Sequence, residues 1–442
     1  MFICKGVAMP FTRFFSDRKG GVTPLLALGI IPIVGAVGAA VDYSRANSVR
    51  TAMQAAGDAT ALMLAKSAST TTPDQLQQNA TAYFQANFHR PEAQGLQVTA
   101  TYAQGASGST VTVNGAATVN TSFIGLMGIS QIPLTTTGTV SWSNARLRVA
   151  LVLDNTGSMA QYGKMTALQT ASHNLLNQLK SAAQQDGDVY VSIIPFAKDV
   201  NVGASNYTQS WIKWSGESDT WDERNGTCTK SSYHTKSTCT ANKGAWTPKN
   251  HNTWNGCVMD RDQNYDTLNT SPSTASTQFP AEQYSACPAA LMGLSYDWTA
   301  LNSKIDAMKP SGGTNQAIGL AWGWQSLTNA PLSVPTMDPT YQYQQIVILL
   351  TDGLNTQDRW YGNGYNTSTQ VDARQQTLCG NIKAAGITIY TVQVNTDGDP
   401  TSSLLQQCAS DPTKFFLLTN ANEIVTTFNT IGTSLQQLHL AK

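Results

Sequence analysis

The sequence predicts an α/β protein whose main domain is a doubly wound, mostly parallel sheet, and three features support that fold class. Apolar runs rich in β-branched residues, such as 149–153 and 346–350, have the composition of buried parallel strands. Segments with apolar residues near helical spacing lie between such runs, as at 164–183. Both runs end in a polar loop that carries an Asp, as is typical of the sheet edge where α/β proteins hold ligands.

The remaining elements alternate in the same way through residues 147–440. We expect further strands at 189–196, 387–394 and 415–418. We expect further helices at 372–385, 402–410 and 421–438. Strands that alternate with helices favour a parallel sheet with right-handed crossovers and helices on both faces.

Oxygen-bearing side chains follow the predicted strands. Asp154, Thr156 and Ser158 occupy alternate positions at the end of the first run. Farther along, Thr314 precedes an apolar helical stretch, and Asp352 ends the second run. Because the carboxyl ends of parallel strands meet at one edge, we expect these side chains to converge. Carboxylates and hydroxyls without sulfur or imidazole favour a hard cation, which we expect to be Mg²⁺, or else Mn²⁺ or Ca²⁺.

The pattern Asp-x-Thr-Gly-Ser at 154–158 resembles the metal-ion-dependent adhesion site (MIDAS) of von Willebrand factor A domains. Thr314 and Asp352 match the second and third loops of that family. The resemblance implies a von Willebrand factor A-type domain at 147–440 and metal roles for the residues of all three loops. It also implies a protein partner that contacts the metal through an acidic residue. The alternative is the same fold without a metal.

The amino-terminal region predicts a membrane anchor. Residues 22–41 carry no charge and are long enough to cross a bilayer as a helix. Basic residues are concentrated in 1–21, which favours a cytoplasmic amino end and an extracytoplasmic location for everything after Asp42. The competing interpretation is a cleaved signal peptide, for which 38–40 (Gly-Ala-Ala) would serve as a cleavage site.

Residues 42–143 predict a periplasmic helix extension followed by a small β region. The Ala-rich segment 44–67 has apolar residues at helical spacing and is expected to prolong the membrane helix. After Gly95 the pattern changes to alternating Thr and Val, which indicates β-strands. A long amino-terminal helix that leads into a small β region is typical of pilin-like subunits.

Cysteine usage agrees with export. Cys4 precedes the anchor, and an even number of cysteines follows it, which suggests disulfides in an oxidising space such as a bacterial periplasm. Cys379 and Cys408 lie on the two helices that flank the strand at 387–394 and could meet. The connectivity of the others stays open: Cys228, Cys239, Cys257 and Cys287. Zinc is the rival use, but no Cys-x-x-Cys pair is present.

These four cysteines lie in or beside an insert at about 203–302 that is rich in Trp, Tyr, Asn and Thr. Two interpretations are open for its tryptophans. They form a small core inside a disulfide-linked excursion, or they present a partner-binding surface near the metal.

Charge balance and the absence of catalytic motifs argue against two classes of function. The chain has 442 residues, and its 27 Lys and Arg balance 27 Asp and Glu, so it lacks the basic surface that nucleic acid requires. Nucleophile-elbow, Walker and zinc-hydrolase motifs are absent from the sequence, and its histidines are scattered. We therefore expect a binding protein and not an enzyme.

The amino-terminal segment also resembles a known family. Gly20-Gly21, the small-residue span, 41–45 (Val-Asp-Tyr-Ser-Arg) and 53–59 (Met-Gln-Ala-Ala-Gly-Asp-Ala) are similar to the TadE/TadG-like segment of the tight-adherence (Flp) pilus system. TadG-like proteins commonly join this segment to a von Willebrand factor A domain. One departure is that cleavage after Gly21 would place Leu26 where pilin-type processing usually requires Glu, which argues against processing.

The resemblance implies an inner-membrane-anchored protein of the bacterial envelope that helps to assemble or anchor Flp pili. Its partners would be other pilus assembly components. The alternative function is a surface adhesin that binds host or abiotic ligands directly through the metal site.

Overall fold

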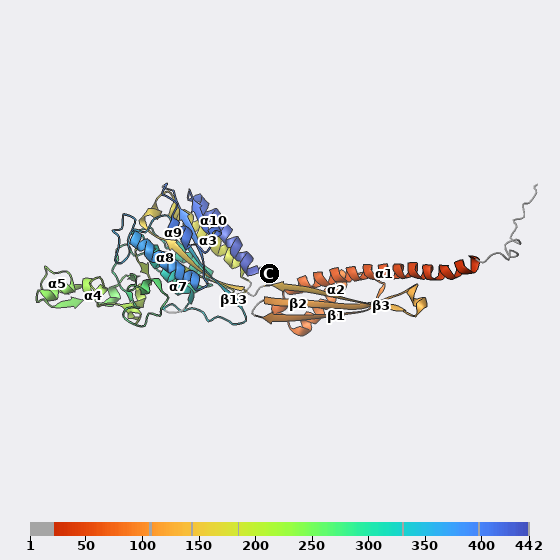
Figure 1. The fold of residues 1–442 in the computed structure, drawn as a ribbon. Coiled ribbons are helices and arrows are strands. Elements are labelled where there is room, and N and C mark those ends of the chain that lie inside the picture. Colours follow the sequence, from red (N-terminus) through yellow and green to blue (C-terminus); the bar gives the residue numbers. More distant parts are fainter. Residues whose placement is uncertain are drawn as a thin grey trace, which may run out of the picture. The chain divides into compact units, whose positions relative to one another are not determined.

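The computed structural model describes residues 22–105, 108–142, 145–183, 185–328, 331–396 and 398–440. They form two compact units, here called the amino-terminal unit (up to 104, with 109–142) and the carboxyl-terminal unit (143–442, with 105–108) (Figure 1). Each unit has its own apolar core.

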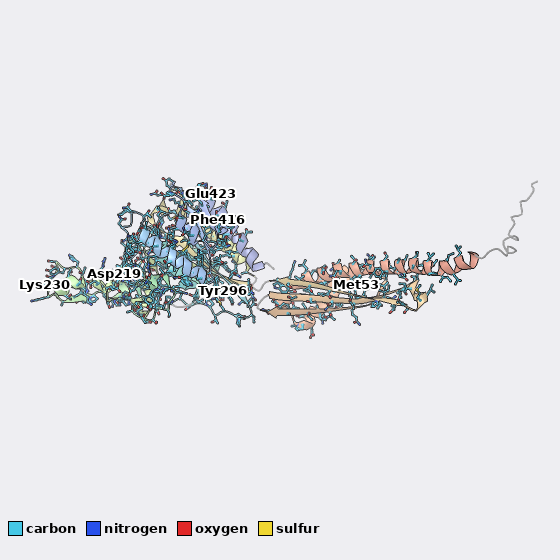
Figure 2. All side chains as sticks on the ribbon, viewed as in Figure 1. Met53, Asp219, Lys230, Tyr296, Phe416 and Glu423 are labelled. Carbon is cyan, nitrogen blue, oxygen red and sulfur yellow. A yellow bond between two sulfur atoms is a disulfide. The ribbon has the colours of Figure 1, made fainter. Side chains whose placement is uncertain are left out.

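The amino-terminal unit packs two helices on a three-stranded antiparallel sheet of order β1-β2-β3. Its elements are α1 (Val22–Ala65), α2 (Pro73–Asn87), β1 (Ala93–Gly105), β2 (Gly108–Asn120) and β3 (Gln131–Trp142). The expected helix 44–67 is the second part of α1. Small residues let it approach the sheet closely, because a Cβ built on Gly138 of β3 would lie 2.5 Å from the carbonyl carbon of Gly57. Met53, labelled in Figure 2, is fully buried in this core.

One helix of the described residues is long and apolar enough to cross a membrane, by length and composition. It is the segment Leu28–Ala65 of α1, with a mean hydropathy of 1.2. Its first part presents large apolar side chains to the outside, among them Leu28, Ile31 and Val37. The residues before Val22, which include the basic segment and Cys4, lie outside the described residues.

The carboxyl-terminal unit confirms the predicted fold class, because its sheet is doubly wound and mostly parallel. The strand order is β10-β6-β5-β4-β13-β14-β15. The parallel strands are β4 (Ala145–Asp154), β5 (Val189–Phe196), β13 (Gln342–Thr351), β14 (Thr388–Val394) and β15 (Phe415–Leu418). Short antiparallel strands β6 (Val200–Asn201), β10 (Cys257–Val258) and β12 (Met292–Ser295) complete the β5 edge.

Helices cover both faces of this sheet. One face packs against α3 (Lys164–Ala182), α6 (Trp298–Asp306) and α10 (Asn422–Leu440). The other packs against α7 (Gln316–Thr328), α8 (Thr369–Ala384) and α9 (Ser403–Cys408). Figure 1 shows α3 and α10 side by side, as their packing contacts require. Helix α6 begins at Trp298, so the final part of the predicted insert belongs to this helical layer.

Besides β10 and β12 of the main sheet and the start of α6, the helices and strands of the insert are short. They are β7 (Ile212–Lys213), α4 (Trp221–Arg224), β8 (Gly226–Cys228), α5 (Lys236–Ala241), β9 (Trp246–Pro248) and β11 (Phe279–Pro280). Single 3₁₀ turns occur along the chain at Ala68–Thr70, Ile124–Met127, Gly157–Ala160, Ala204–Thr208, His251–Thr253, Tyr265–Thr267 and Pro412–Lys414.

The tryptophans of the insert are mostly interior. Trp211, Trp221 and Trp254 are at most 9% exposed and belong to the same core cluster as helix α7. The rings of Trp211 and Trp322 of α7 meet edge to face at 5.9 Å. These side chains therefore extend the main core, and they form neither a separate small core nor an open partner-binding surface.

All six cysteines of the carboxyl-terminal unit form disulfides. Cys379 and Cys408 join α8 to α9, as expected, with 5.1 Å between their Cα atoms. The pairing of the other four cysteines, which the sequence left open, is Cys228–Cys239 and Cys257–Cys287. Each pair has a Cα–Cα distance of 5.8 Å. The rival use of these cysteines as zinc ligands is thereby contradicted.

This pairing predicts the outcome of thiol alkylation. In the denatured but unreduced full-length protein, only Cys4 should react with a maleimide, because the other thiols are consumed in disulfides. Mass spectrometry should show one modification, and seven after reduction, since the chain has 7 cysteines. Several modifications before reduction would contradict the three bridges.

Candidate functional site

The site begins at the end of β4, at the centre of the carboxyl edge of the sheet. Asp154 is fully buried. Its Oδ1 accepts hydrogen bonds from the Thr156 backbone N–H at 2.8 Å and from the Thr156 hydroxyl at 2.6 Å. Its Oδ2 accepts one from the Thr351 hydroxyl at 2.7 Å, which comes from the end of the neighbouring strand β13. Two adjacent parallel strands therefore fix both carboxylate oxygens.

Polar contacts continue from this carboxylate to Asp352. The hydroxyls of Thr156 and Ser158 are 3.1 Å apart. Ser158 then donates to Asp352 Oδ1 at 2.7 Å. Asp154, Thr156, Ser158 and Asp352 thus form one continuous polar chain, as the convergence of strand ends predicted.

Thr314 completes the group. A Cβ built on Gly353 would lie 3.9 Å from both the Ser158 hydroxyl and the Thr314 hydroxyl, so these two hydroxyls face the same small space. The Thr314 carbonyl accepts the Thr356 N–H at 2.9 Å, and Thr314 N–H donates to the Thr356 hydroxyl at 2.9 Å. The structure therefore brings together all five residues selected from the sequence.

Backbone hydrogen bonds hold the first and second loops together. The Gly157 N–H donates to the Gly312 carbonyl at 3.0 Å, and the Ser311 N–H donates to the Asn155 carbonyl at 2.8 Å. Gly312 has a φ of +87° and packs against Tyr284, where a Cβ would lie 2.5 Å from the tyrosine oxygen. Only glycine fits both the backbone conformation and the space at this position.

Lys164 is a site residue that sequence reasoning missed. It is the first residue of α3, its side chain is completely buried, and its Nζ lies 2.8 Å from Asp352 Oδ2. A lysine at the start of an amphipathic helix is usually solvent-exposed, so nothing in the sequence indicated this contact. The carboxylate of Asp352 is therefore shared between the Ser158 hydroxyl and an ammonium group.

Burial controls the electrostatics of the site. Removal from water, and then the nearby Asp352 carboxylate, raise the pKa of Asp154 to about 7, although the hydrogen bonds from Thr156 and Thr351 act in the opposite direction. Lys164 balances the charge of one of the two carboxylates, so the pair keeps one negative charge in excess. The oxygen-only donor set and this charge deficit fit a hard divalent cation.

Within the described residues, no group of three or more His, Cys, Asp and Glu side chains is placed to hold a metal ion. The site is instead built from a pair of carboxylates supplemented by hydroxyls, a donor set that suits Mg²⁺ better than zinc.

The insert is fastened to the loops of the site. Arg359, which follows the third loop, has a fully buried side chain and forms ion pairs with Glu217, Asp219 and Asp262 of the insert. Tyr284 of the insert accepts a hydrogen bond from the Gly313 N–H at 3.2 Å. The insert therefore supports the second and third loops from outside the sheet.

Comparison with known families agrees with this geometry. The sequence-family model of the von Willebrand factor type A domain matches residues 263–430, which contain Thr314 and Asp352. The Asp154 loop lies upstream of that match, and the structure connects it through the pairing of β4 with β13. The carboxyl-terminal unit is therefore a von Willebrand factor A domain interrupted by an insert after its second parallel strand.

The model of Flp pilus-assembly TadE/G-like proteins matches residues 20–65. The chain thus joins a TadE/G-like segment to a von Willebrand factor A domain, which is the arrangement of a TadG-like protein. This segment and the apolar helix fit a membrane-anchored envelope protein, and the two matches together describe a pilus-associated von Willebrand factor A protein. No curated protein matches the chain.

Several solved structures match the chain at low sequence identity and low TM-score. The pilus adhesin SpaC from Lactobacillus rhamnosus GG is 14% identical with a TM-score of 0.36, and the match covers 80% of this chain but only 36% of SpaC. The vWF domain of the type V pili tip protein Mfa5 from Porphyromonas gingivalis is 10% identical with a TM-score of 0.36, covering 67% of this chain and 97% of that domain. The pilus adhesin RrgA from Streptococcus pneumoniae is 11% identical with a TM-score of 0.34, covering 78% and 50%.

Proposed function

We propose that this protein is an envelope anchor of the tight-adherence (Flp) pilus system that binds a protein partner through a divalent cation at its von Willebrand factor A domain. The observation that carries the proposal is the convergence of Asp154, Thr156, Ser158, Thr314 and Asp352 at one edge of the sheet. The TadE/G-like segment supports a role in assembling or anchoring pili.

The residues of the site have distinct roles in this proposal. Asp154 and Asp352 supply negative charge, and the hydroxyls of Thr156, Ser158 and Thr314 supply neutral oxygens. When bound, a hard cation such as Mg²⁺, Mn²⁺ or Ca²⁺ supplies positive charge and a position for an acidic side chain of the partner. Lys164 adds a further positive charge beside Asp352, so the loaded site carries net positive charge and favours an acidic ligand.

The proposed topology places residues 1–21 in the cytoplasm, 22–41 in the inner membrane, and both 42–143 and the von Willebrand factor A domain at 147–440 in the periplasm. The uncharged segment with a basic flank on its amino-terminal side supports this orientation. The three disulfides support an oxidising compartment for the carboxyl-terminal unit.

Affinity capture from the cell envelope tests this function. Tagged full-length protein is isolated from detergent-solubilised membranes in Mg²⁺, then washed with a chelator. We expect the chelator to release Flp pilus components identified by mass spectrometry, because their acidic contact depends on the cation.

An identical set of bound proteins before and after chelation would contradict a cation-dependent role. If chelation instead abolishes attachment of whole cells to surfaces and leaves capture of envelope proteins unchanged, the adhesin function takes the place of the assembly function.

A further inference from the structure

The turn between β2 and β3 is unusually apolar for an exposed segment. We call residues 121–130 the apolar turn; they contain the 3₁₀ turn Ile124–Met127 and no charged residue. Phe123 is 43% exposed, Leu126 89%, Met127 64% and Ile129 54%. A soluble surface rarely gathers this many large apolar side chains in one turn without a partner to cover them.

The apolar turn lies against the part of α1 that is expected to cross the membrane. A Cβ built on Gly38 would lie 2.5 Å from the Phe123 side chain, and one built on Gly35 would lie 2.6 Å from Met127 Cε. Gly35 precedes Asp42 by seven residues, or roughly 10 Å along a helix. The turn therefore runs alongside the uncharged segment 22–41, on the amino-terminal side of Asp42.

Asp42 attaches the turn to the helix. Its carboxylate is 3% exposed and accepts three backbone hydrogen bonds, from Ser122, Phe123 and Ile124, at 2.8 to 2.9 Å. These bonds hold the turn at a fixed level of α1. They also satisfy three N–H groups that a low-dielectric environment would otherwise leave unpaired.

Most of the remaining backbone of the turn is also satisfied internally. Four more N–H groups donate to carbonyls within the turn, those of Thr121, Leu126, Gly128 and Ile129. Non-helical backbone is tolerated at membrane depth only where its polar groups find partners. The apolar turn meets this condition, which an ordinary solvated loop has no reason to meet.

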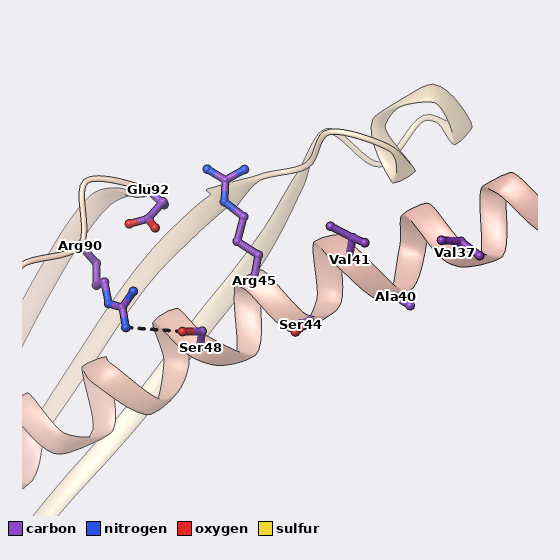
Figure 3. A pocket seen from close by; sticks show the side chains of 8 residues that line it. All are labelled: Val37, Ala40, Val41, Ser44, Arg45, Ser48, Arg90 and Glu92. Carbon is purple, nitrogen blue, oxygen red and sulfur yellow. Dashed lines mark hydrogen bonds between the residues drawn. The ribbon is translucent and has the colours of Figure 1, made fainter.

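The polar boundary of the amino-terminal unit lies at the same level. Figure 3 shows a groove on α1 whose lining changes along the helix, from apolar Val37, Ala40 and Val41 to a polar end. Arg45, Arg90 and Glu92 line that polar end, and Arg90 donates to the Ser48 hydroxyl at 3.4 Å. Charged residues therefore begin on α1 at Asp42 and appear on the neighbouring connection between α2 and β1 at this level.

From these contacts we propose that the apolar turn enters the outer leaflet of the same membrane that α1 spans, so that the protein contacts the bilayer at two points. The occupant of this surface is lipid, because the turn is continuous with the lipid-facing segment of α1 and carries no charged side chain. The turn sets the depth and orientation of the helix, with Asp42 at the level of the lipid headgroups.

Fluorescence quenching in full-length protein tests this proposal. In a C4S background, unreduced so that the disulfides persist, Leu126→Cys is labelled with the environment-sensitive dye NBD. The protein is reconstituted into vesicles of phosphatidylethanolamine and phosphatidylglycerol that carry acyl-chain spin labels. We expect a blue-shifted emission and strong quenching at position 126. The matched control is Gln104→Cys, an exposed residue at the opposite end of the same sheet, which should show neither effect.

A second pair of variants tests the packing on the helix. Gly38→Leu should displace Phe123 and reduce the quenching at position 126, whereas Gly29→Leu should not, because a Cβ at Gly29 has open space. Water-like emission at 126, or equal quenching at 126 and 104, would overturn the proposal. Water-like emission in vesicles that becomes protected only in cell membranes would assign the turn to a protein partner instead.

Discussion

Asp154→Asn should abolish measurable binding of Mg²⁺ or Mn²⁺ while the protein stays folded. The substitution removes one of two carboxylates that face the proposed cation, and such a charge interaction is worth several kcal/mol, or on the order of a hundredfold to a thousandfold in affinity. Asparagine keeps the size of the side chain and one oxygen that can still accept the Thr156 hydrogen bonds. Its NH2 group takes the place of the other oxygen, and the Thr351 hydroxyl must turn to accept from it. Titration calorimetry of full-length protein in detergent measures the loss.

Asp154→Ala is the harsher comparison. The side chain is fully buried and not at an open edge, so alanine leaves three donors without an acceptor and should lower the free energy of unfolding by about 1–3 kcal/mol. The control is Asp186→Asn, because Asp186 is exposed in the turn that leads into the amino end of β5, away from the site. Unchanged cation binding in Asp154→Asn would show that this carboxylate holds no metal, and the cation would then bind at another place.

Lys164→Met should strengthen cation binding by about tenfold to a hundredfold. The Lys164 ammonium lies 2.8 Å from Asp352 Oδ2 and competes with a cation for the same carboxylate. Methionine retains most of the apolar volume of the side chain and removes the competing charge. The cation-free variant should also be less stable by about 3–5 kcal/mol, because Asp352 is left buried and unpaired.

The stronger cation binding and the lower cation-free stability of Lys164→Met should both appear in thermal unfolding. Mg²⁺ should raise the Tm of Lys164→Met far more than that of the wild type, since the cation replaces the lost positive charge. The control is Lys180→Met, at the exposed opposite end of the same helix. Equal Tm increases in wild type and Lys164→Met would show that Lys164 and the cation do not share Asp352.

The parallel core of the domain and the loops that carry the site could be predicted from the amino-acid pattern alone. Strands β5 and β15 begin and end where predicted, and β14 begins one residue later, because strands buried on both faces are continuous apolar runs with sharp polar ends. The same rule located Asp154 and Asp352, since the carboxyl ends of adjacent parallel strands meet. The pairing of Cys379 with Cys408 followed from the two helices that flank β14.

Which polar and aromatic residues are buried depends on long-range packing and could not be predicted from local pattern. Lys164 and Arg359 read as ordinary surface cations, yet both side chains are fully buried against carboxylates far away in the sequence. The insert has weak periodicity, so neither its cysteine pairing nor the packing of Trp211 on Trp322 could be derived from local pattern. Local sequence specifies elements through backbone propensity and apolar spacing, whereas a buried charge is stable only when its partner is brought within a few ångströms by the fold.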